Sequence, residues 1–351
     1  MGVAGDENSG AAPTAVLPLR TDRLLLRVVR PHDAEAIVEM RNHPDVARYQ
    51  DWPVPYTAAD AERLVEACRD IDDVTVDEWV QVAIVLDDEM VGDVAVHLGS
   101  GGATASVGYS LRREWWGRGI AREAMHAMVD ALFARGVQRI VATLDPANVA
   151  SMRVLEHLGF VHEGTARRAE LIRGEWLDDM RYGLLRDDRA EWLDRPRSFA
   201  DVRLVELTPD SVRTYGRLAT HPSQQQFVAP MCASFGDALF PEVIDGAPVL
   251  PWMRGVEADG VAVGFMMVAA VTEAHPEPYL WRLLIDRRYQ RSGVGAAAVG
   301  RLVEHLRAEG HRRLQVSWVD GPGGPRRFYE RLGFVPTGRL IDGEVEGVLD
   351  L

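Results

Sequence analysis

Lysine is absent from this chain of 351 residues: all 39 basic residues are arginine, and they are outnumbered by 53 aspartates and glutamates. The formal net charge of −14 argues against nucleic acid as the main ligand, because basic residues drive binding to its phosphates. An acidic balance suits a cationic substrate such as an amine, and solubility alone accounts for it equally well. The arginine-only, alanine-rich composition is typical of a bacterium with a GC-rich genome.

Cysteines and long apolar runs are also scarce. The two cysteines, Cys68 and Cys232, have no metal-like spacing, so no metal site is predicted and a reducing cytoplasm is favoured. No apolar run reaches the ~18–20 residues that span a bilayer, and residues 1–16 lack the basic and apolar segments of a secretory signal. We therefore expect a cytoplasmic protein without a membrane partner, beginning with a flexible tail over residues 1–16.

An internal repeat organises the rest of the sequence. The stretch WWGRGIA at 115–121 has a counterpart, YQRSGVG, at 289–295, and each precedes a Gly-Phe pair. The glycines at 119 and 159 in the first copy correspond to those at 293 and 333 in the second, so the two copies keep one constant offset. A repeat in one register predicts two copies of one domain. The predicted boundaries are a first domain at 17–186, a linker at 187–200 and a second domain at 201–351.

Each copy mixes strand and helix patterns. Residues 120–135 carry apolar side chains at helical spacing, and Gly136 is a typical end for that helix. Thr57 is a typical N-cap for the helix that follows it. The patterns predict an α+β, or mixed α/β, fold. In the first copy strands are expected at 24–29, 79–86, 90–98, 105–111 and 139–144 and on both sides of 173–175, and helices at 33–41, 59–70, 120–135 and 151–158. In the second copy, which begins near Val202, strands are expected at 262–271, 279–285 and 313–318 with a short final hairpin, and helices are expected up to Glu309 and at 325–332.

The repeated stretches lie where a strand ends and a helix begins. The free N–H groups of a first helical turn point outward, and the helix dipole is positive there, so this is a favourable place for phosphate. Glycine lets the backbone approach the anion, and Arg118 can add a charge-assisted contact. The P-loop motif of nucleotide hydrolases and the three-glycine dinucleotide motif are both missing.

At these residues the chain resembles the GNAT superfamily of N-acetyltransferases. The signature of that superfamily is Gln/Arg-x-x-Gly-x-Gly/Ala; residues 290–295 match it fully, and residues 116–121 match except for tryptophan at the first position. The resemblance implies two tandem GNAT domains, each a mostly antiparallel twisted sheet flanked by helices, with acetyl-CoA as cofactor. It further implies that strands near 107–111 and 283–285 splay from the next strand and admit the pantetheine arm. The implied cofactor-binding residues are Trp116, Gly117, Arg118, Gly119, Ile120, Ala121 and Asn148 in the first copy and Gln290, Arg291, Ser292, Gly293, Val294 and Gly295 in the second.

Longer stretches resemble particular branches of the superfamily. LRTDRLLLRVVRPHDAEAI at 19–37 and WPVPYT at 52–57 are similar to the RimJ/RimL-type enzymes, which acetylate protein N-termini and, in some members, small amines. SQQQFVAP at 223–230 and FYERLGF at 328–334 are similar to the spermine/spermidine acetyltransferases of the BltD type. The first likeness covers about residues 17–186 and the second about 202–351.

Acetyl transfer from a thioester requires a proton to leave the amine and a proton to reach the thiolate. The RimL-type resemblance implies that Ser151 is the general acid and Glu170 the general base. The alternatives are that Ser151 stabilises a helix start and that Glu170 simply faces solvent; Asn148 either positions the cofactor or caps the same helix. In the second copy, Tyr329 stands at the tyrosine of the superfamily's Tyr-x-x-x-Gly-Phe ending, which implies that it protonates the thiolate, with core packing as the alternative.

The two copies differ at these positions. The first has Leu155 in place of the tyrosine, and the second has Pro322 and Pro325 in place of Asn148 and Ser151. Aligning the final hairpin turns places Arg339 opposite Glu170, so the second copy is expected to lack that base. The remaining acidic candidates there are Glu273 and Asp286.

These observations predict an acetyl-CoA-dependent N-acetyltransferase that acts on a primary amine, favouring a small cationic molecule such as a polyamine or an amine-bearing antibiotic. A protein N-terminus is the alternative acceptor. A different class of function, in which one or both domains bind acyl-CoA without catalysis, also stays open. The two copies are expected either to act as a monomeric pseudo-dimer or to form a homodimer.

Overall fold

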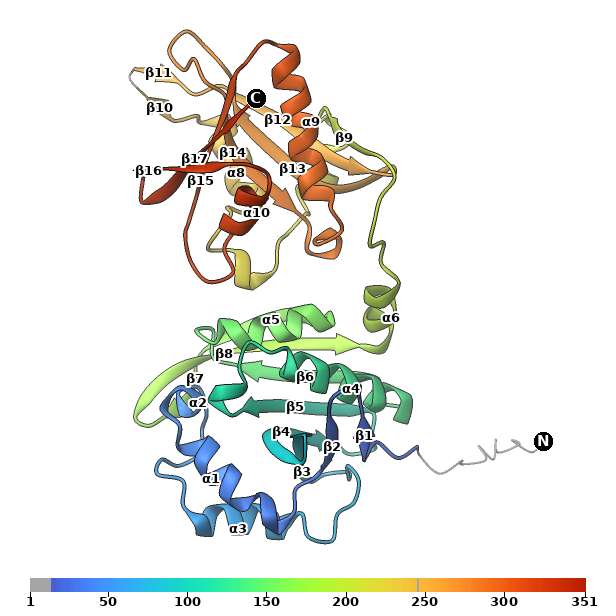
Figure 1. The fold of residues 1–351 in the computed structure, drawn as a ribbon. Helices are drawn as coiled ribbons and strands as arrows, with labels where there is room; N and C mark the ends of the chain where they lie inside the picture. Colours follow the sequence, from blue (N-terminus) through green and yellow to red (C-terminus); the bar gives the residue numbers. More distant parts are fainter. Residues whose placement is uncertain (1–13, 245) are drawn as a thin grey trace, which may run out of the picture. The chain divides into compact units, whose positions relative to one another are not determined.

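The computed structural model describes residues 14–244 and 246–351, which form two compact units that divide between Leu193 and Asp194 (Figure 1). The tail predicted for residues 1–16 lies outside the described residues as far as residue 13. Its last residue belongs to the first unit, because Val16 is buried and its backbone N–H donates a hydrogen bond to Asp73. Among the helices of the described ranges, none has the length and apolar character needed to cross a bilayer.

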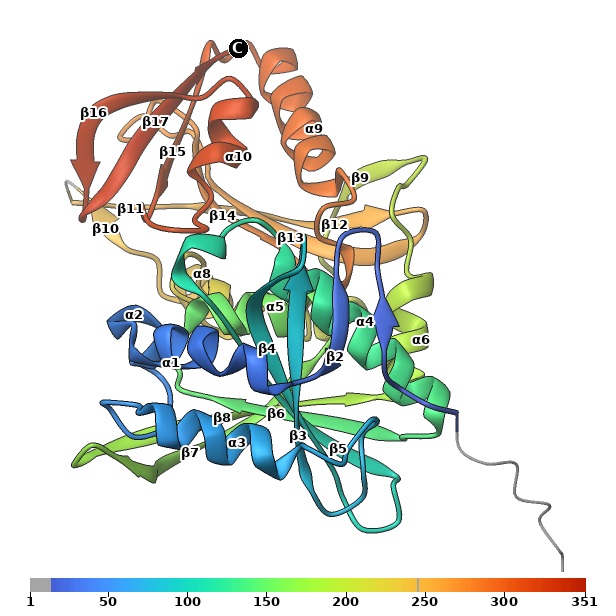
Figure 2. The same cartoon turned by 60° about the horizontal axis from the view of Figure 1, so that its bottom comes forward.

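The first unit is a mixed sheet with helices on both faces. Its strands are β1 (Leu19–Arg20), β2 (Leu25–Val28), β3 (Trp79–Leu86), β4 (Glu89–Leu98), β5 (Thr104–Leu111), β6 (Arg139–Leu144), β7 (Val161–Ile172) and β8 (Glu175–Leu185). Its helices are α1 (Ala34–Asn42), α2 (Pro44–Ala47), α3 (Ala58–Ala67), α4 (Ile120–Arg135), α5 (Val149–Leu158) and α6 (Arg186–Asp194), with 3-10 turns η1 (Pro31–Asp33) and η2 (Arg113–Trp115). The strand order is β1-β2-β3-β4-β5-β6-β8-β7, and β5 and β6 run parallel whereas the other neighbours are antiparallel. Figure 2 shows α1 and α3 on one face of this sheet and α4 on the other.

Local sequence explains where α4 and α3 lie. The apolar positions of α4 fall three and four residues apart and are buried against the sheet. The helix ends at Gly136, whose φ of 119° suits glycine because an L side chain is strained in such a conformation. Thr57 caps α3 as predicted, and Asp60 completes a capping box with it. For α4, the observed bounds Ile120–Arg135 confirm the helix predicted at 120–135.

The second unit repeats this architecture with a seven-stranded sheet. Its main strands are β9 (Val202–Val205), β12 (Pro251–Ala258), β13 (Val261–Ala269), β14 (Tyr279–Ile285), β15 (Arg313–Trp318), β16 (Val335–Ile341) and β17 (Glu344–Asp350), and a separate ribbon pairs β10 (Val243–Ile244) with β11 (Ala247–Pro248). Its helices are α7 (Val212–Tyr215), α8 (Met231–Leu239), α9 (Val294–Ala308) and α10 (Arg326–Arg331), with 3-10 turns η3 (Pro222–Gln224) and η4 (Arg287–Tyr289). The order is β16-β17-β15-β14-β13-β12-β9, and β14 and β15 form the parallel pair. Both units are thus the mixed, mostly antiparallel folds that the sequence predicts.

Some elements were not predicted. Strand β12 begins with Pro251 and contains Gly255, two residue types that are depleted in strands, so its strand signal is weak. Helix α8 follows Pro230 and contains Gly236, which obscures its helical character. Helix α6 occupies much of the segment expected to be a linker.

The parallel strands of each sheet separate after a short paired stretch. Residues 104–106 of β5 pair with 139–141 of β6, and Tyr279 and Leu280 of β14 pair with Gln315 and Val316 of β15. The remaining residues of β5 and β14 have no paired partner on the next strand. The splay expected near 107–111 and 283–285 is confirmed, and it opens beside the start of α4 or α9.

Candidate active site

The two glycine turns have backbone conformations suited to binding an anion. Gly119 and Gly293 precede α4 and α9 with φ of 79° and 86°, and Gly117 has φ of 75°. A Cβ added at Gly117 or Gly293 would meet no heavy atom within 4 Å, so the space over these turns is open. Free N–H groups of the helix starts face such a space. The turns therefore fit the diphosphate of a nucleotide cofactor.

The first residue of each turn holds the backbone in the same way. The Trp116 indole N–H donates to the carbonyl oxygen of Leu111 at 2.9 Å. The Gln290 amide donates to the carbonyl oxygen of Ile285 at 3.0 Å. Leu111 and Ile285 are related by the constant offset of the repeat, so the bond is equivalent in the two copies. Tryptophan thus departs from the signature but keeps its hydrogen bond to the preceding strand.

The start of α4 differs from the start of α9 by a charged pair. Glu123, in the first turn of α4, forms an ion pair of 2.6 Å with Arg23 and accepts a hydrogen bond from Thr21. Burial raises the pKa of Glu123, but the bonds from Thr21 and Arg23 outweigh it and lower the pKa overall. Arg23 also donates to the Arg118 carbonyl, so a cation stands beside the first turn. Arg23 was not predicted as a site residue, because its contact with Glu123 joins residues 100 positions apart in the sequence.

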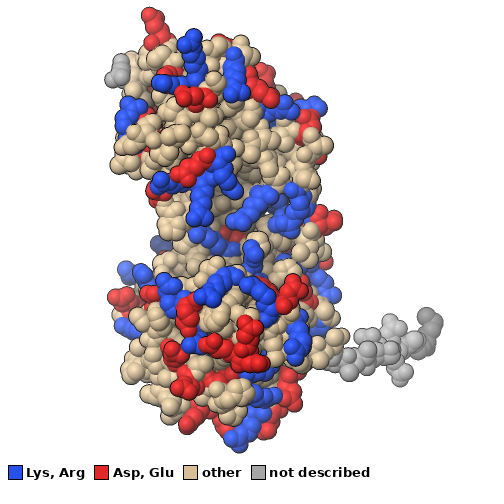
Figure 3. Space-filling model, viewed as in Figure 1, with Lys and Arg blue, Asp and Glu red and all other residues tan. Residues whose placement is uncertain are grey.

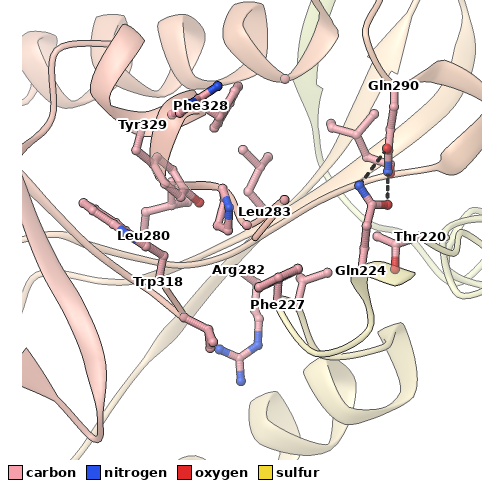
Figure 4. A pocket seen from close by; sticks show the side chains of 18 of the residues that line it. Thr220, Gln224, Phe227, Leu280, Arg282, Leu283, Gln290, Trp318, Phe328 and Tyr329 are labelled. Carbon is pink, nitrogen blue, oxygen red and sulfur yellow. Dashed lines mark hydrogen bonds between the residues drawn. The ribbon is translucent and has the colours of Figure 1, made fainter. Parts of the chain in front are cut away.

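The second unit contains a cavity of about 1340 Å³ beside its glycine turn (Figure 4). Figure 4 shows Tyr329 and Trp318 on one wall and Gln290, bonded to Gln224, on the other. Five of the residues predicted for this copy line the cavity: Gln290, Arg291, Gly293, Gly295 and Tyr329. The other two serve the turn itself, since the Ser292 hydroxyl donates to the Tyr289 carbonyl and the Val294 side chain is buried.

Tyr329 is held on α10 between aromatic neighbours. It is buried, and its ring stacks on Trp318 with centroids 5.5 Å apart. Burial is the main cause that raises the pKa of Tyr329, and the nearby Tyr279 and Glu344 raise it further. A raised pKa keeps the phenol protonated at neutral pH, which a proton donor requires. Packing and proton donation are therefore compatible at this residue.

In the first unit the structure places Asn148 and Ser151 together. The Asn148 side chain accepts a hydrogen bond of 3.1 Å from the Ser151 backbone N–H and so caps α5. The Ser151 carbonyl accepts a hydrogen bond of 3.0 Å from the Tyr109 hydroxyl. Because these bonds use the backbone of Ser151, the cap leaves its hydroxyl available for chemistry.

Glu170 lies near the tip of the hairpin formed by β7 and β8. Arg173, at the turn, donates to the carbonyls of Ala47 and Gln50 at 2.7 and 2.8 Å, which brings the hairpin against the segment after α2. Partial burial raises the pKa of Glu170, and the carboxylates of Asp179 and Asp51 raise it further. Glu170 is thus one member of a group of acidic side chains.

Asp179 was not predicted as a site residue. It stands on β8 at the end of β6, where it accepts hydrogen bonds from the Thr143 side chain and the Leu144 backbone. Burial outweighs these bonds and raises the pKa of Asp179. In the second unit, Asp286 instead caps a turn: it is buried, accepts from the Ala219 backbone N–H and forms an ion pair with Arg288.

The alignment that placed Arg339 opposite Glu170 was wrong. Arg339 lies close to the turn of the second hairpin and forms an ion pair with the buried Glu346. Sheet pairing shows that the two hairpins differ in length. Asp179 and Glu344 stand at the same level of the two sheets, one residue beyond the pairs Leu144–Met180 and Trp318–Val345. Asp179 pairs with Ala166, well before the turn of the first hairpin, whereas Glu344 pairs with Ile341 directly beside the turn of the second. The second hairpin therefore ends before it reaches the level of Glu170, and the turn residues are not equivalent.

Comparison with known proteins identifies related sequences for both units. Residues 23–161 match the family described as "Acetyltransferase (GNAT) domain", and residues 218–334 match "Acetyltransferase (GNAT) family". The uncharacterized N-acetyltransferase p20 of Bacillus licheniformis is 28% identical over 175 residues, covering 49% of this chain and 98% of the relative. The uncharacterized N-acetyltransferase YoaA of Bacillus subtilis is 30% identical over 176 residues, covering 48% and 96%. The [ribosomal protein uS5]-alanine N-acetyltransferase of Escherichia coli is 35% identical over 83 residues, covering 23% and 43%.

Proposed function

The chain belongs to the GNAT acetyltransferase family and uses acetyl-CoA as its acetyl donor, and from this premise we propose that it acetylates a primary amine of a small cationic molecule. A polyamine or an amine-bearing antibiotic has the required chemistry. The observation that carries the proposal is the acidic group beside the splayed strands of the first unit, where partial burial raises the pKa of Glu170 and the charges of Asp179 and Asp51 raise it further. An ammonium group that enters there relieves the repulsion between these carboxylates.

The distribution of charge supports a cationic acceptor in the first unit. Residues 1–193 hold 33 acidic and 21 basic residues, a balance of −12, whereas residues 194–351 hold 20 and 18, a balance of −2. On the face drawn in Figure 3, acidic side chains gather over the first unit, which Figure 1 shows in the same view. Nearly all of the net charge that attracts cations therefore belongs to this unit.

The cofactor residues have distinct roles in this proposal. The turns that contain Gly117, Gly119 and Gly293 present the N–H groups of α4 and α9 to the diphosphate of acetyl-CoA. Trp116 and Gln290 hold these turns against the preceding strand. When bound between the splayed strands, the cofactor supplies an activated acetyl thioester.

The catalytic residues follow the needs of acetyl transfer. Glu170 takes a proton from the amine in the first domain, and Ser151 supplies a proton to the thiolate. Tyr329, kept protonated by its raised pKa, supplies that proton in the second domain. A RimJ/RimL-like first domain and a polyamine-acetyltransferase-like second domain would then act on different amines.

A protein N-terminus is the second candidate acceptor. One relative acts, by its name, on an alanine of ribosomal protein uS5, and it shares 35% identity over 83 residues with this chain. An α-amino group has a pKa near ~8, against about 10.4 for a lysine-type alkylamine, so it loses its proton more readily near neutral pH.

An amine panel tests the proposal. Acetyl-CoA and the full chain are incubated with polyamines, aminoglycosides, amino-acid amides and N-terminal peptides, and the released thiol is measured. We expect the fastest turnover with a cationic small molecule. Turnover with peptides alone would contradict the proposed acceptor, and CoA binding without turnover on any amine would favour a non-catalytic binding protein.

A further inference from the structure

The two sheets share an acidic position that the sequence repeat does not reveal. At the end of β6, Leu144 pairs with Met180 of β8, and at the end of β15, Trp318 pairs with Val345 of β17. Leu144 and Trp318 are themselves equivalent, because the constant offset of the repeat relates them. The next residue toward the hairpin turn is Asp179 in the first unit and Glu344 in the second. These two carboxylates therefore occupy the same place in the two sheets.

Each of these carboxylates accepts a hydrogen bond from a hydroxyl at an equivalent position. Thr143 donates to Asp179, and Ser317 donates to Glu344. Thr143 and Ser317 are related by the same offset, so the hydroxyl follows the repeat although the residue type differs. A carboxylate and its hydroxyl are thus retained as a pair in both units.

The pair in the second unit faces the cavity. Glu344 and Ser317 line it together with Tyr329, and the charge of Glu344 contributes to the raised pKa of Tyr329. The second acidic residue that lines the cavity, Glu330, is neutralised by an ion pair of 2.8 Å with Arg326. Within residues 14–244 and 246–351, no arginine or histidine forms an ion pair with Glu344, whose carboxylate is therefore available to a cationic ligand.

The pair in the first unit lies beside Glu170. Asp179 is half-buried, and its charge adds to the effect of burial in raising the pKa of Glu170. The second hairpin turns before it reaches the level of Glu170. Its shorter strands therefore place no second carboxylate beside Glu344 at that level. The shared position thus brings an acid to the end of the splayed strands in both units.

We propose that Asp179 and Glu344 bind the ammonium group of the acceptor, each in its own domain, and that Glu344 also takes its proton. This inference rests on the proposed acetyltransferase function and names the residues that receive the amine. In the first site Glu170 takes the proton of the amine that Asp179 binds, whereas Glu344 performs both tasks in the second. The hydroxyls of Thr143 and Ser317 orient the two carboxylates.

Protons are conserved through the reaction in the second domain. Glu344 takes one proton from the ammonium group and releases it to solvent. The amine nitrogen then forms a bond to the thioester carbonyl carbon, whose π electrons move to oxygen. When the carbonyl reforms, the C–S bond breaks and Tyr329 gives its proton to sulfur. Glu344 takes the second nitrogen proton and returns it to the Tyr329 phenolate, so each turnover releases one proton.

The test uses the full chain with one cofactor turn disabled. Gly119→Val leaves the second domain to be measured, and Gly293→Val leaves the first. In these backgrounds we expect Glu344→Gln to lower kcat/KM for the best amine of the panel by roughly 100-fold or more, the range of general-base catalysis. Asp179→Asn should lower it by roughly tenfold or more, the effect of losing a hydrogen bond to a charged group. In the first domain Asp179→Asn should also move the decline of kcat/KM to lower pH, because burial and then the charge of Asp179 raise the pKa of Glu170. Calorimetry should show weakened spermidine binding to the CoA complex, with CoA affinity unchanged.

Matched variants separate this role from a structural one. Glu175→Gln and Asp342→Asn remove exposed acids next to the same turns and should leave kcat/KM unchanged. Glu344→Asp and Asp179→Glu should restore part of the activity and of the spermidine affinity. If Glu344→Gln and Asp179→Asn keep the wild-type kcat/KM and pH profile, the inference is overturned while the proposed function stands. If the unmodified chain acetylates no amine, the proposed function fails, and this inference fails with it.

Discussion

The glycine turns of the two domains share the hydrogen bond that holds each turn to the preceding strand, whereas the final hairpins of the two domains differ in length. Trp116 and Gln290 differ in chemistry but donate to equivalent backbone carbonyls. The first hairpin extends beyond the level at which the second hairpin turns, so Glu170 has no counterpart in the second domain. The cofactor end of the site is constrained by one invariant ligand, while the acceptor end is free to vary. We therefore expect variants at the turns to affect both domains alike and variants at the hairpins to affect them differently.

The largest effect should come from the glycine turns. Valine at Gly119 or Gly293 must adopt a positive φ, which is a genuine outlier for a β-branched residue, and its side chain would project into the space over the turn. Each variant should weaken CoA binding at its own site by roughly 100-fold, about 2.7 kcal/mol. Titration calorimetry should show two sites in the unmodified chain and one in each variant. Two remaining sites in both variants would contradict the assignment of the turns.

The next largest effect should distinguish the catalytic residues of the first domain from those of the second. Tyr329→Phe should lower turnover in the second domain by roughly 100-fold and leave the first unchanged, because it removes the proton donor but keeps the ring that packs on Trp318. Glu170→Gln should lower turnover in the first domain, because it removes the general base, and leave the second domain unchanged. Both are measured by thiol release in the backgrounds with one disabled turn. If Glu170→Gln abolishes all turnover and Tyr329→Phe has no effect, the second domain is not an independent active site.

A smaller effect tests the equivalence of Trp116 and Gln290. Trp116→Gln should leave CoA affinity at the first site close to that of the unmodified chain, because glutamine can form the same bond to Leu111. Trp116→Leu should lose that bond, worth about 1 kcal/mol or roughly fivefold in affinity. Calorimetry in the Gly293→Val background measures both. Equal affinity of the glutamine and leucine variants would show that the hydrogen bond has no role.

The smallest effect concerns stability. The pKa of Glu170 is raised in the folded protein, so the folded state binds this proton more tightly than the unfolded state does. The stability that the protonated group contributes is fully present below its ordinary pKa of 4.5 and is lost as the pH rises toward the raised value. Glu170→Gln should therefore flatten the fall in Tm across that window, measured by thermal unfolding, whereas Glu175→Gln should not.

The sequence predicted the elements that have clear apolar spacing or a glycine at one end. The bounds of β3, α4, β6, β14 and β15 follow from apolar spacing and glycine positions, and five predicted residues of the second copy meet at one cavity. The repeat could not reveal Asp179 and Glu344, because they do not follow its constant offset and only sheet pairing shows their equivalence. The sequence did not indicate Arg23 as a site residue, because its contact with Glu123 joins residues 100 positions apart and only the fold brings them together.

The length of the final hairpin has a consequence for how such a duplicated enzyme can diversify. A tip of a few residues carries Glu170 and Arg173, and the strand pairs beneath it continue unchanged without them in the second domain. Insertions and deletions at this tip can therefore alter one acceptor site while the core strands and cofactor turn keep their geometry. Grafting the longer tip onto β16 and β17 offers an engineering route to a second domain with the selectivity of the first.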